Sequence, residues 1–125
     1  MLIVVSPAKK MDMKAVEAAP TQPAFADRAE ELATIARDLS VGDLQKLMHI
    51  SENLAKLNAD RFRNFGEMER KPAALAFAGD TYIGLDAASL DPDEMTWAQD
   101  HFRILSGLYG VLRPMDEIQP YRLEM

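Results

Sequence analysis

Two adjacent lysines follow the first apolar run of the chain. Lys9 and Lys10 come after Ser6-Pro7, which ends an aliphatic run at residues 2–5. Because open α/β sheets place ligands at the loops that leave their strand ends, either ammonium group is suited to meet a phosphate as a point charge. The segment lacks the glycines of a P-loop and predicts no nucleotide motif. Two solvated lysines on a turn are an equally good interpretation.

A second candidate site lies between two glycines near the end of the chain. Gly107 and Gly110 flank two apolar residues and join two segments that we expect to be helical. This spacing is similar to the hairpin of helix–hairpin–helix DNA-binding modules, in which backbone N–H groups face a phosphate. A C-cap glycine followed by a packing glycine explains it equally well. The candidate DNA-binding residues are Lys9, Lys10, Arg103, Gly107, Leu108, Tyr109, Gly110 and Arg113.

Metal binding and nucleophilic catalysis find little support in the sequence. The chain has no cysteine, and its two histidines, His49 and His101, lie far apart. This composition predicts neither a metal site nor a cofactor. Ser6 and Ser106 lack the context of a nucleophile elbow. The two arginines that flank the glycine hairpin are equally suited to ordinary surface ion pairs.

The composition is that of one globular domain. The chain has 125 residues, 48% of them hydrophobic and 27% charged, and we expect a single domain over residues 1–125. No apolar run approaches the ~18 residues that a membrane span needs, so we expect a cytoplasmic protein without a membrane partner. The net charge is −6, and residues 80–100 carry six acids and no base. This balance opposes indiscriminate polyanion binding but permits a local basic face.

The residue periodicities predict an α/β fold. We expect a small β-sheet flanked by helices, with a helix–hairpin–helix-like element near residues 95–118. The expected strands cover residues 2–5, residues 73–78 and a short piece at 81–83. We expect the first of these strands to be buried. The expected helices cover residues 25–39 and 44–48, a segment that begins after Ser51, and a segment that begins after Asp91 and buries residues up to Leu105.

The start of the last helix carries the clearest local signal. Asp91 is a good N-cap, Pro92 suits the first helical position, and Glu94 completes a capping box. Residues 120–125 then alternate as a strand does and stop. Because a native terminus is usually a frayed polar tail, we expect the chain to be a truncated piece of a longer protein.

Several ordered motifs of the chain resemble the YaaA peroxide-stress family. The motifs are Ser6-Pro7-Ala8-Lys9 and residues 47–51, 54–58 with 61–62, 76–80, 97–99, 105–110, 112–114 and 120–125. Lys10-Met11 replaces the family's more usual Thr-Leu, and Thr81 stands where valine is common. The resemblance covers the whole chain but only the N-terminal half of the family's length.

The resemblance implies a bacterial cytosolic protein that helps cells to survive hydrogen peroxide. It implies sequence-independent DNA binding, a role in limiting iron-dependent oxidative damage, and a helix–hairpin–helix-like element at residues 107–110. It also implies that the loop of Lys9 lies near a basic cleft and that the absent half docks on this chain. The alternative is an enzyme acting on a phosphorylated or nucleotide-like small molecule, in a pocket lined by Lys9, Tyr109, Arg113 and Arg122.

Overall fold

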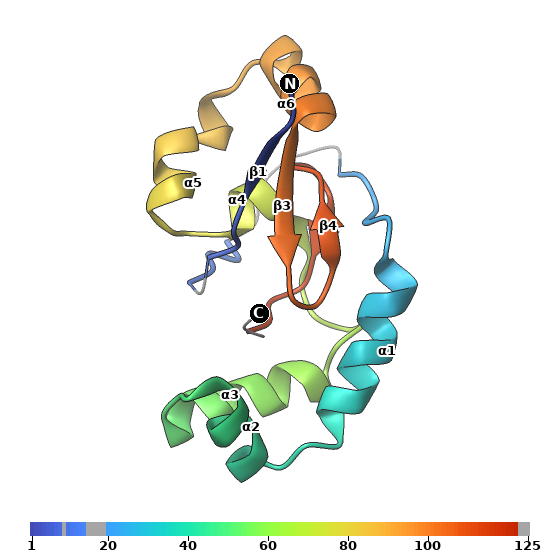
Figure 1. The fold of residues 1–125 in the computed structure, drawn as a ribbon, viewed down its shortest axis with the longest axis vertical. Coiled ribbons are helices and arrows are strands. Elements are labelled where there is room, and N and C mark those ends of the chain that lie inside the picture. Colours follow the sequence, from blue (N-terminus) through green and yellow to red (C-terminus); the bar gives the residue numbers. More distant parts are fainter. Residues whose placement is uncertain (9, 15–19, 123–125) are drawn as a thin grey trace.

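The computed structural model describes residues 1–8, 10–14 and 20–122 and places helices above and below a small sheet in the view of Figure 1. In chain order the elements are β1 (Ile3–Val5), α1 (Ala26–Arg37), α2 (Val41–Met48), α3 (Glu52–Arg63), β2 (Lys71–Pro72), α4 (Ala73–Ala76), α5 (Asp80–Leu85), η1 (Ala87–Ser89, a 3₁₀ turn), α6 (Pro92–His101), β3 (Phe102–Ser106), β4 (Gly110–Leu112) and β5 (Glu117–Ile118). The expected α/β class is confirmed.

The main sheet has the strand order β1-β3-β4. β1 runs parallel to β3, with Ile3 opposite Phe102, and β3 forms an antiparallel hairpin with β4. A second, two-stranded sheet pairs β2 with β5. The first strand of the chain therefore joins the sheet by pairing with β3, which lies about a hundred residues later in the sequence.

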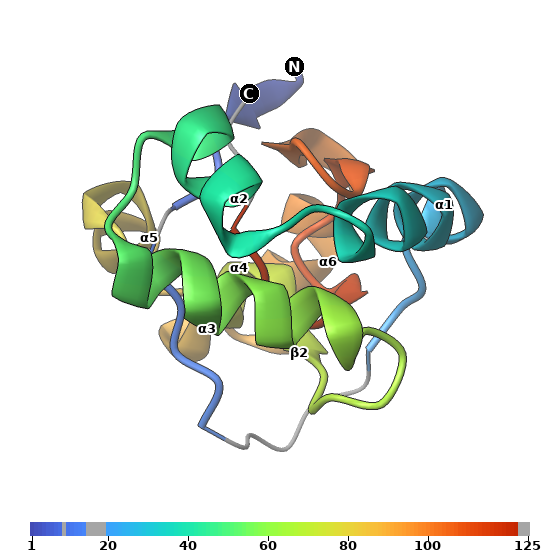
Figure 2. The same ribbon diagram turned by 90° about the horizontal axis from the view of Figure 1, so that it is seen from below.

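Helices α1, α2 and α3 form one end of the molecule, below the sheet in Figure 1 and toward the viewer in Figure 2. Their buried positions include Ala29, Ala33 and Ala55, whose small side chains let the helices approach closely. Ser51 caps α3 by accepting a hydrogen bond from the Leu54 amide, and Asp91 and Glu94 form the capping box of α6. Both predicted N-caps are confirmed.

The strands expected at residues 73–78 and 81–83 are wrong. Residues 73–76 form one turn of helix, α4. Three of these four residues are alanine, which has the highest helix propensity and so favours the helical turn. The Ala73 amide donates to the Asp116 carbonyl, so tertiary contacts complete this turn. Residues 81–83 lie inside α5, which begins after Gly79 with Asp80 in its first turn.

The first strand exists, but it is not buried. Leu2 is 57% exposed and Val4 is 50% exposed, although the continuous apolar run is typical of a strand that is covered on both faces. β1 lies at the edge of the sheet, and Val4 remains largely uncovered although Val5 packs against the core. The expected burial is therefore wrong for the chain as it stands.

Candidate functional site

The segment after β1 is anchored by contacts with residues 76–82. The Tyr82 hydroxyl donates a hydrogen bond to the Ser6 carbonyl at 2.5 Å. Beyond the loop, the Ala78 amide donates to the Lys10 carbonyl at 2.9 Å, and the Asp12 amide donates to the Ala76 carbonyl at 2.7 Å. Two sequence motifs about seventy residues apart are thus joined. Lys9 itself lies outside the described residues.

A pocket of about 410 Å³ opens between these two segments. Lys10 is exposed, and Gly79 lies so close to the loop that a Cβ at this position would come within 3.1 Å of the Ala8 side chain. The glycine therefore lets the two segments meet. The residues that line the pocket are Pro7, Ala8, Lys10, Ala78, Gly79, Asp80, Thr81 and Tyr82.

The lysines of the loop and of its neighbouring segment differ in how freely they can meet a ligand. Lys71 is buried, and its ammonium donates to the Asp12 carbonyl at 2.8 Å and lies 3.9 Å from the Asp12 carboxylate. The Lys14 amide, with Lys71 as a second cause, holds the pKa of Asp12 below its ordinary value. Lys71 therefore serves the fold, whereas Lys10 presents its charge to solvent.

The expected helix–hairpin–helix element is a helix followed by a β-hairpin, so this expectation is wrong. α6 ends at His101, and residues 102–106 form β3 instead of continuing the helix to Leu105. Phe102 and Leu105 fit a helical spacing, but in the structure Phe102, Ile104 and Ser106 are buried and alternate with the more exposed Arg103 and Leu105. Pairing with β1 and β4 selects the strand.

The tip of this hairpin turns into the core. Leu108 and Tyr109 are buried, and their amides both donate to the Ser106 hydroxyl oxygen, at 3.3 and 3.0 Å. These are amides that a phosphate-binding hairpin would present outward. Gly110 has φ +75°, and a Cβ there would come within 3.2 Å of the Phe25 ring. The glycine spacing therefore has a conformational and packing explanation.

Both arginines of the candidate set bind backbone or buried groups of the same chain. One guanidinium nitrogen of Arg103 donates to the carbonyls of Gln99 and Phe102, at 2.6 and 2.8 Å, next to the C-terminal end of α6. Arg113 forms an ion pair with the fully buried Asp116 at 2.9 Å and also donates to the Gln22 carbonyl. Each guanidinium thus ties segments of the fold together.

The residues of the alternative enzyme site have separate partners. The Tyr109 hydroxyl accepts a hydrogen bond from the Gln119 amide, and the Arg122 amide donates to the Asn58 side chain. Burial raises the pKa of Tyr109, and it raises the pKa of neighbouring Tyr121 to about 12. Tyr121 in turn shares a short hydrogen bond with the Ser106 hydroxyl. Both phenols stay protonated at neutral pH, so neither is a general base.

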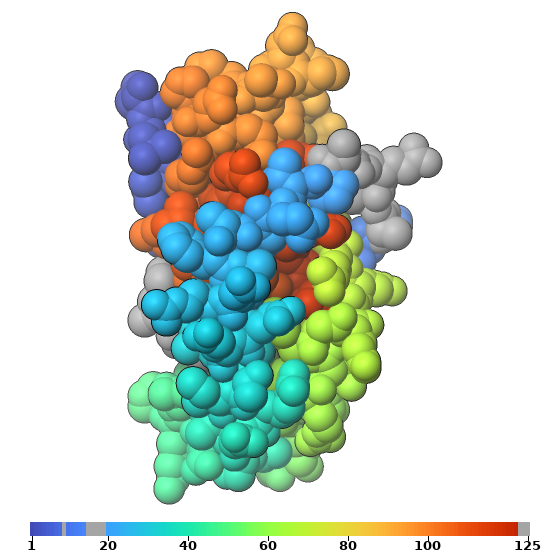
Figure 3. Space-filling view, turned by 90° about the vertical axis from the view of Figure 1, so that its right-hand side faces the viewer, coloured from blue at the N-terminus to red at the C-terminus, as the bar shows by residue number. Residues whose placement is uncertain are grey.

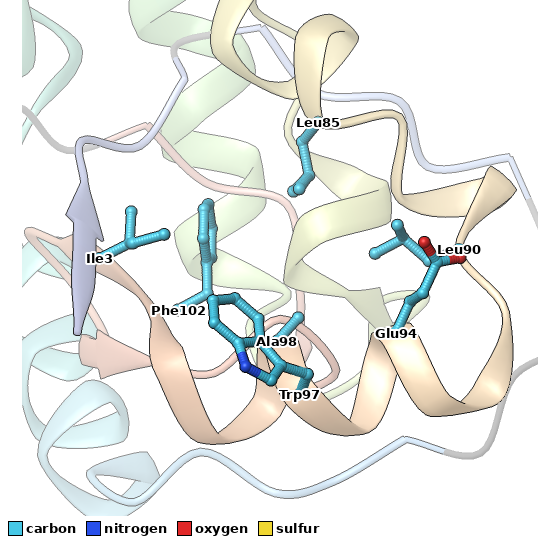
Figure 4. Close-up of a pocket in the computed structure, with 7 residues that line it drawn as sticks. All are labelled: Ile3, Leu85, Leu90, Glu94, Trp97, Ala98 and Phe102. Carbon is cyan, nitrogen blue, oxygen red and sulfur yellow. The ribbon is translucent and has the colours of Figure 1, made fainter. Parts of the chain in front are cut away.

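A second pocket, of about 340 Å³, lies between β1, α5 and α6 (Figure 4). Trp97, Phe102 and Ile3 give it apolar walls. Glu94 is the one charged residue among the seven that line it. Its carboxylate accepts a hydrogen bond from the backbone amide of Asp91, the N-cap residue of α6. This pocket offers apolar surface rather than groups for catalysis.

The described residues contain no cluster of three or more histidine and acidic side chains that is placed to hold a metal ion. His101 stacks on Trp97, with ring centroids 4.3 Å apart, and its Nδ1 lies 2.8 Å from the Trp97 carbonyl oxygen. Within the same described residues, none of the helices combines the length and the apolar character needed to cross a membrane.

Sequence reasoning missed the residues that complete the first pocket. Gly79, Asp80 and Tyr82 belong to a stretch interpreted as strand and turn, whereas the structure places them at the N-cap and in the first turn of α5, where all three line the pocket. The available signal was the motif at residues 76–80, whose position opposite Ser6-Pro7-Ala8-Lys9 depends on the tertiary fold.

The comparisons with known proteins agree with the resemblance of the motifs. The family model "Peroxide stress protein YaaA" matches residues 1–125. A UPF0246 protein of Ruegeria pomeroyi is 62% identical over 129 residues, covering 100% of this chain and 50% of the relative. A UPF0246 protein of Jannaschia sp. is 64% identical over 127 residues, covering 100% and 49%. The chain spans about half the length of these curated relatives, and it belongs to the YaaA family of peroxide stress proteins.

Proposed function

We propose that this chain is part of a peroxide stress protein that binds DNA through its phosphates and so limits iron-dependent oxidative damage. In this proposal Lys9 and Lys10 are the residues of this chain that contact the DNA phosphates. The observation that carries it is the exposed ammonium group of Lys10, on a segment fixed by Ala78 and Tyr82 beside a pocket. Lysine contacts a phosphate as a point charge, so such binding reads no base sequence.

The acidic segment limits where a duplex can approach. Residues 80–100, which form α5, η1 and α6, carry six acids and no base. Phosphates near this surface would be repelled, and a net charge of −6 gives no general attraction to DNA. Contacts therefore fall on the loop, where Lys10 and Lys14 are exposed, and Asp80, which lines the same pocket as Lys10, marks the border of the acidic surface.

The other candidate residues have supporting roles in this proposal. Arg103 and Arg113 hold backbone segments together, and residues 107–110 form a turn whose amides bind Ser106. Reversal of charge at Lys10 should thus weaken binding, whereas loss of Arg113 should first weaken the fold.

Filter binding or anisotropy over a salt series tests the proposal in a full-length chimera, in which this chain replaces the matched half of the Ruegeria pomeroyi relative. Lys10→Glu should weaken binding equally on all sequences and reduce the slope of log affinity against log salt by about 0.9 for each phosphate that the variant no longer neutralises. Lys46→Glu, which changes an exposed lysine on α2, is the matched control. Unchanged affinity and slope in Lys10→Glu would remove the loop from the binding surface.

Protection of DNA is measured separately, by nicking of a plasmid with Fe²⁺ and hydrogen peroxide. The chimera should reduce nicking, and Lys10→Glu should reduce it less, because protection depends on bound protein. Equal protection by both proteins would separate the oxidative role from DNA binding.

The pocket itself supports a second candidate function, the binding or conversion of a phosphorylated small molecule. Its volume of about 410 Å³ lies in the range typical of small-molecule sites, and Lys10 and Asp80 give it one group of each charge. A panel of sugar phosphates and nucleotides should then contain a ligand that raises the melting temperature, with the effect abolished in Lys10→Glu. A panel without any such shift would count against this function.

A further inference from the structure

The main sheet has one covered face and one open face. Because side chains alternate along a strand, the register places Ile104 and Leu112 on one face, and both are fully buried. Val4, Leu105 and Val111 belong to the opposite face and are 50%, 38% and 39% exposed. Three apolar side chains from three adjacent strands thus lie uncovered on the same side.

β1 adds an open edge to this open face. It pairs with β3 on one side only, and Figures 2 and 3 both place the beginning of the chain at the margin of the molecule. Residues 1–5 carry no charged side chain, although exposed edges are normally protected by charges, prolines or bulges. Leu2 is also 57% exposed. The sequence of β1 is therefore that of an interior strand.

We propose that the half of the family protein that this chain lacks covers the open sheet face and the free edge of β1. The relatives continue for about as many residues again as this chain matches, since it spans 50% of the Ruegeria pomeroyi protein and 49% of the Jannaschia protein. A continuous apolar strand next to a parallel neighbour is the pattern of a strand buried on both faces. The missing half supplies the cover that this pattern requires.

The chemistry of the surface favours an intramolecular partner over a charged ligand. Val4, Leu105 and Val111 offer aliphatic contacts. Arg103 is the polar residue of β3 on the same face, and one of its guanidinium nitrogens donates hydrogen bonds to the carbonyls of Gln99 and Phe102 of this chain. Burial of such a surface is driven by the hydrophobic effect and needs apolar side chains on the partner. The edge of β1 also offers backbone groups that an added strand can pair with.

Cysteine labelling tests the proposal, because the 125 residues of this chain include no cysteine. Val4→Cys and Leu105→Cys are placed separately in this chain and in the full-length chimera, with cysteines of the added half replaced by serine. Both should react rapidly with a maleimide in the isolated chain and at least about tenfold more slowly in the chimera, because a covered thiol reacts only through local opening. Ile35→Cys, on an exposed position of α1, is the control and should react equally in both proteins.

Three results would overturn the proposal. The first is equal labelling of Val4→Cys and Leu105→Cys in the isolated chain and the chimera. The second is protection that appears in both proteins only as the concentration rises, which would assign the face to a second copy. The third comes from thermal unfolding of Leu105→Glu. This variant should lower the melting temperature of the chimera, where Leu105 is covered, and should leave that of the isolated chain within about 1 °C, since exposed positions tolerate charge. Equal effects in both proteins would contradict the proposed cover.

Discussion

Arg113 offers a sharp test of the distinction between a DNA contact and a structural ion pair. Asp116 is fully buried, and its carboxylate accepts hydrogen bonds from the Arg113 amide at 2.8 Å, from the Arg113 Nε at 3.1 Å and from the Thr21 hydroxyl at 2.5 Å. The Arg113 Nη2 completes the ion pair at 2.9 Å. Asp116→Ala leaves these donors without their acceptor, and Arg113→Ala leaves a buried carboxylate without its cation.

The magnitude follows from the burial of the two partners. Removing one partner of a buried ion pair costs about 3–5 kcal/mol. The Arg113 side chain is 39% exposed, and rehydration of the freed guanidinium lowers the expected loss for Asp116→Ala to about 2–3 kcal/mol. With an unfolding entropy of roughly 2.1 cal/mol/K per residue, 1 kcal/mol corresponds to about 4 °C for a chain of this length. Asp116→Ala should therefore lower the melting temperature by about 8–12 °C.

Thermal and urea unfolding of the two single variants and the double variant provide the assay. Because each single change already breaks the pair, the double variant should lose much less stability than the sum of the single losses. The salt slope of DNA binding should be unchanged in Arg113→Ala at temperatures where it is folded. A variant that melts at the wild-type temperature but binds DNA with a shallower salt slope would refute this reasoning and return Arg113 to the binding surface.

Two further outcomes follow from the turn and from the buried phenols. Gly110→Ala should lower stability by about 1–2 kcal/mol, because φ +75° and the Phe25 ring oppose a side chain. Gly84→Ala in α5, where a Cβ meets nothing within 4 Å, should not destabilise in the same unfolding experiment. The urea midpoint should fall above pH 10, since the unfolded chain ionises first while burial keeps Tyr121 protonated until about pH 12; a flat profile would contradict this burial.

Local signals predicted the helical part of the fold well. The side chains of Ser51 and Asp91 cap their helices as their sequence context indicates, because a capping hydrogen bond joins residues three positions apart. The helix expected at residues 25–39 is observed as Ala26–Arg37 for a similar reason: its apolar period is set by residues of the same segment.

Strand assignments failed where a distant partner decides the conformation. The apolar residues of segment 102–106 fit a helical spacing, and pairing with β1, formed by the opposite end of the chain, makes the segment a strand. Residues 73–76 form a helical turn because the carbonyls of Asp116 and Pro114 accept its first amides. No local pattern carries that information.

By itself, the sequence determined the family, the α/β class, the N-caps and the motifs around Lys9 and residues 76–80. Only the tertiary structure decided that these two motifs share one pocket, that the glycine hairpin points its amides at Ser106, and that β1 lies open at an edge. The physical reason is the separation along the sequence of the residues that interact. Capping and periodicity act between residues a few positions apart, whereas a pocket, a buried ion pair and a sheet edge depend on contacts between residues that the chain brings together only on folding.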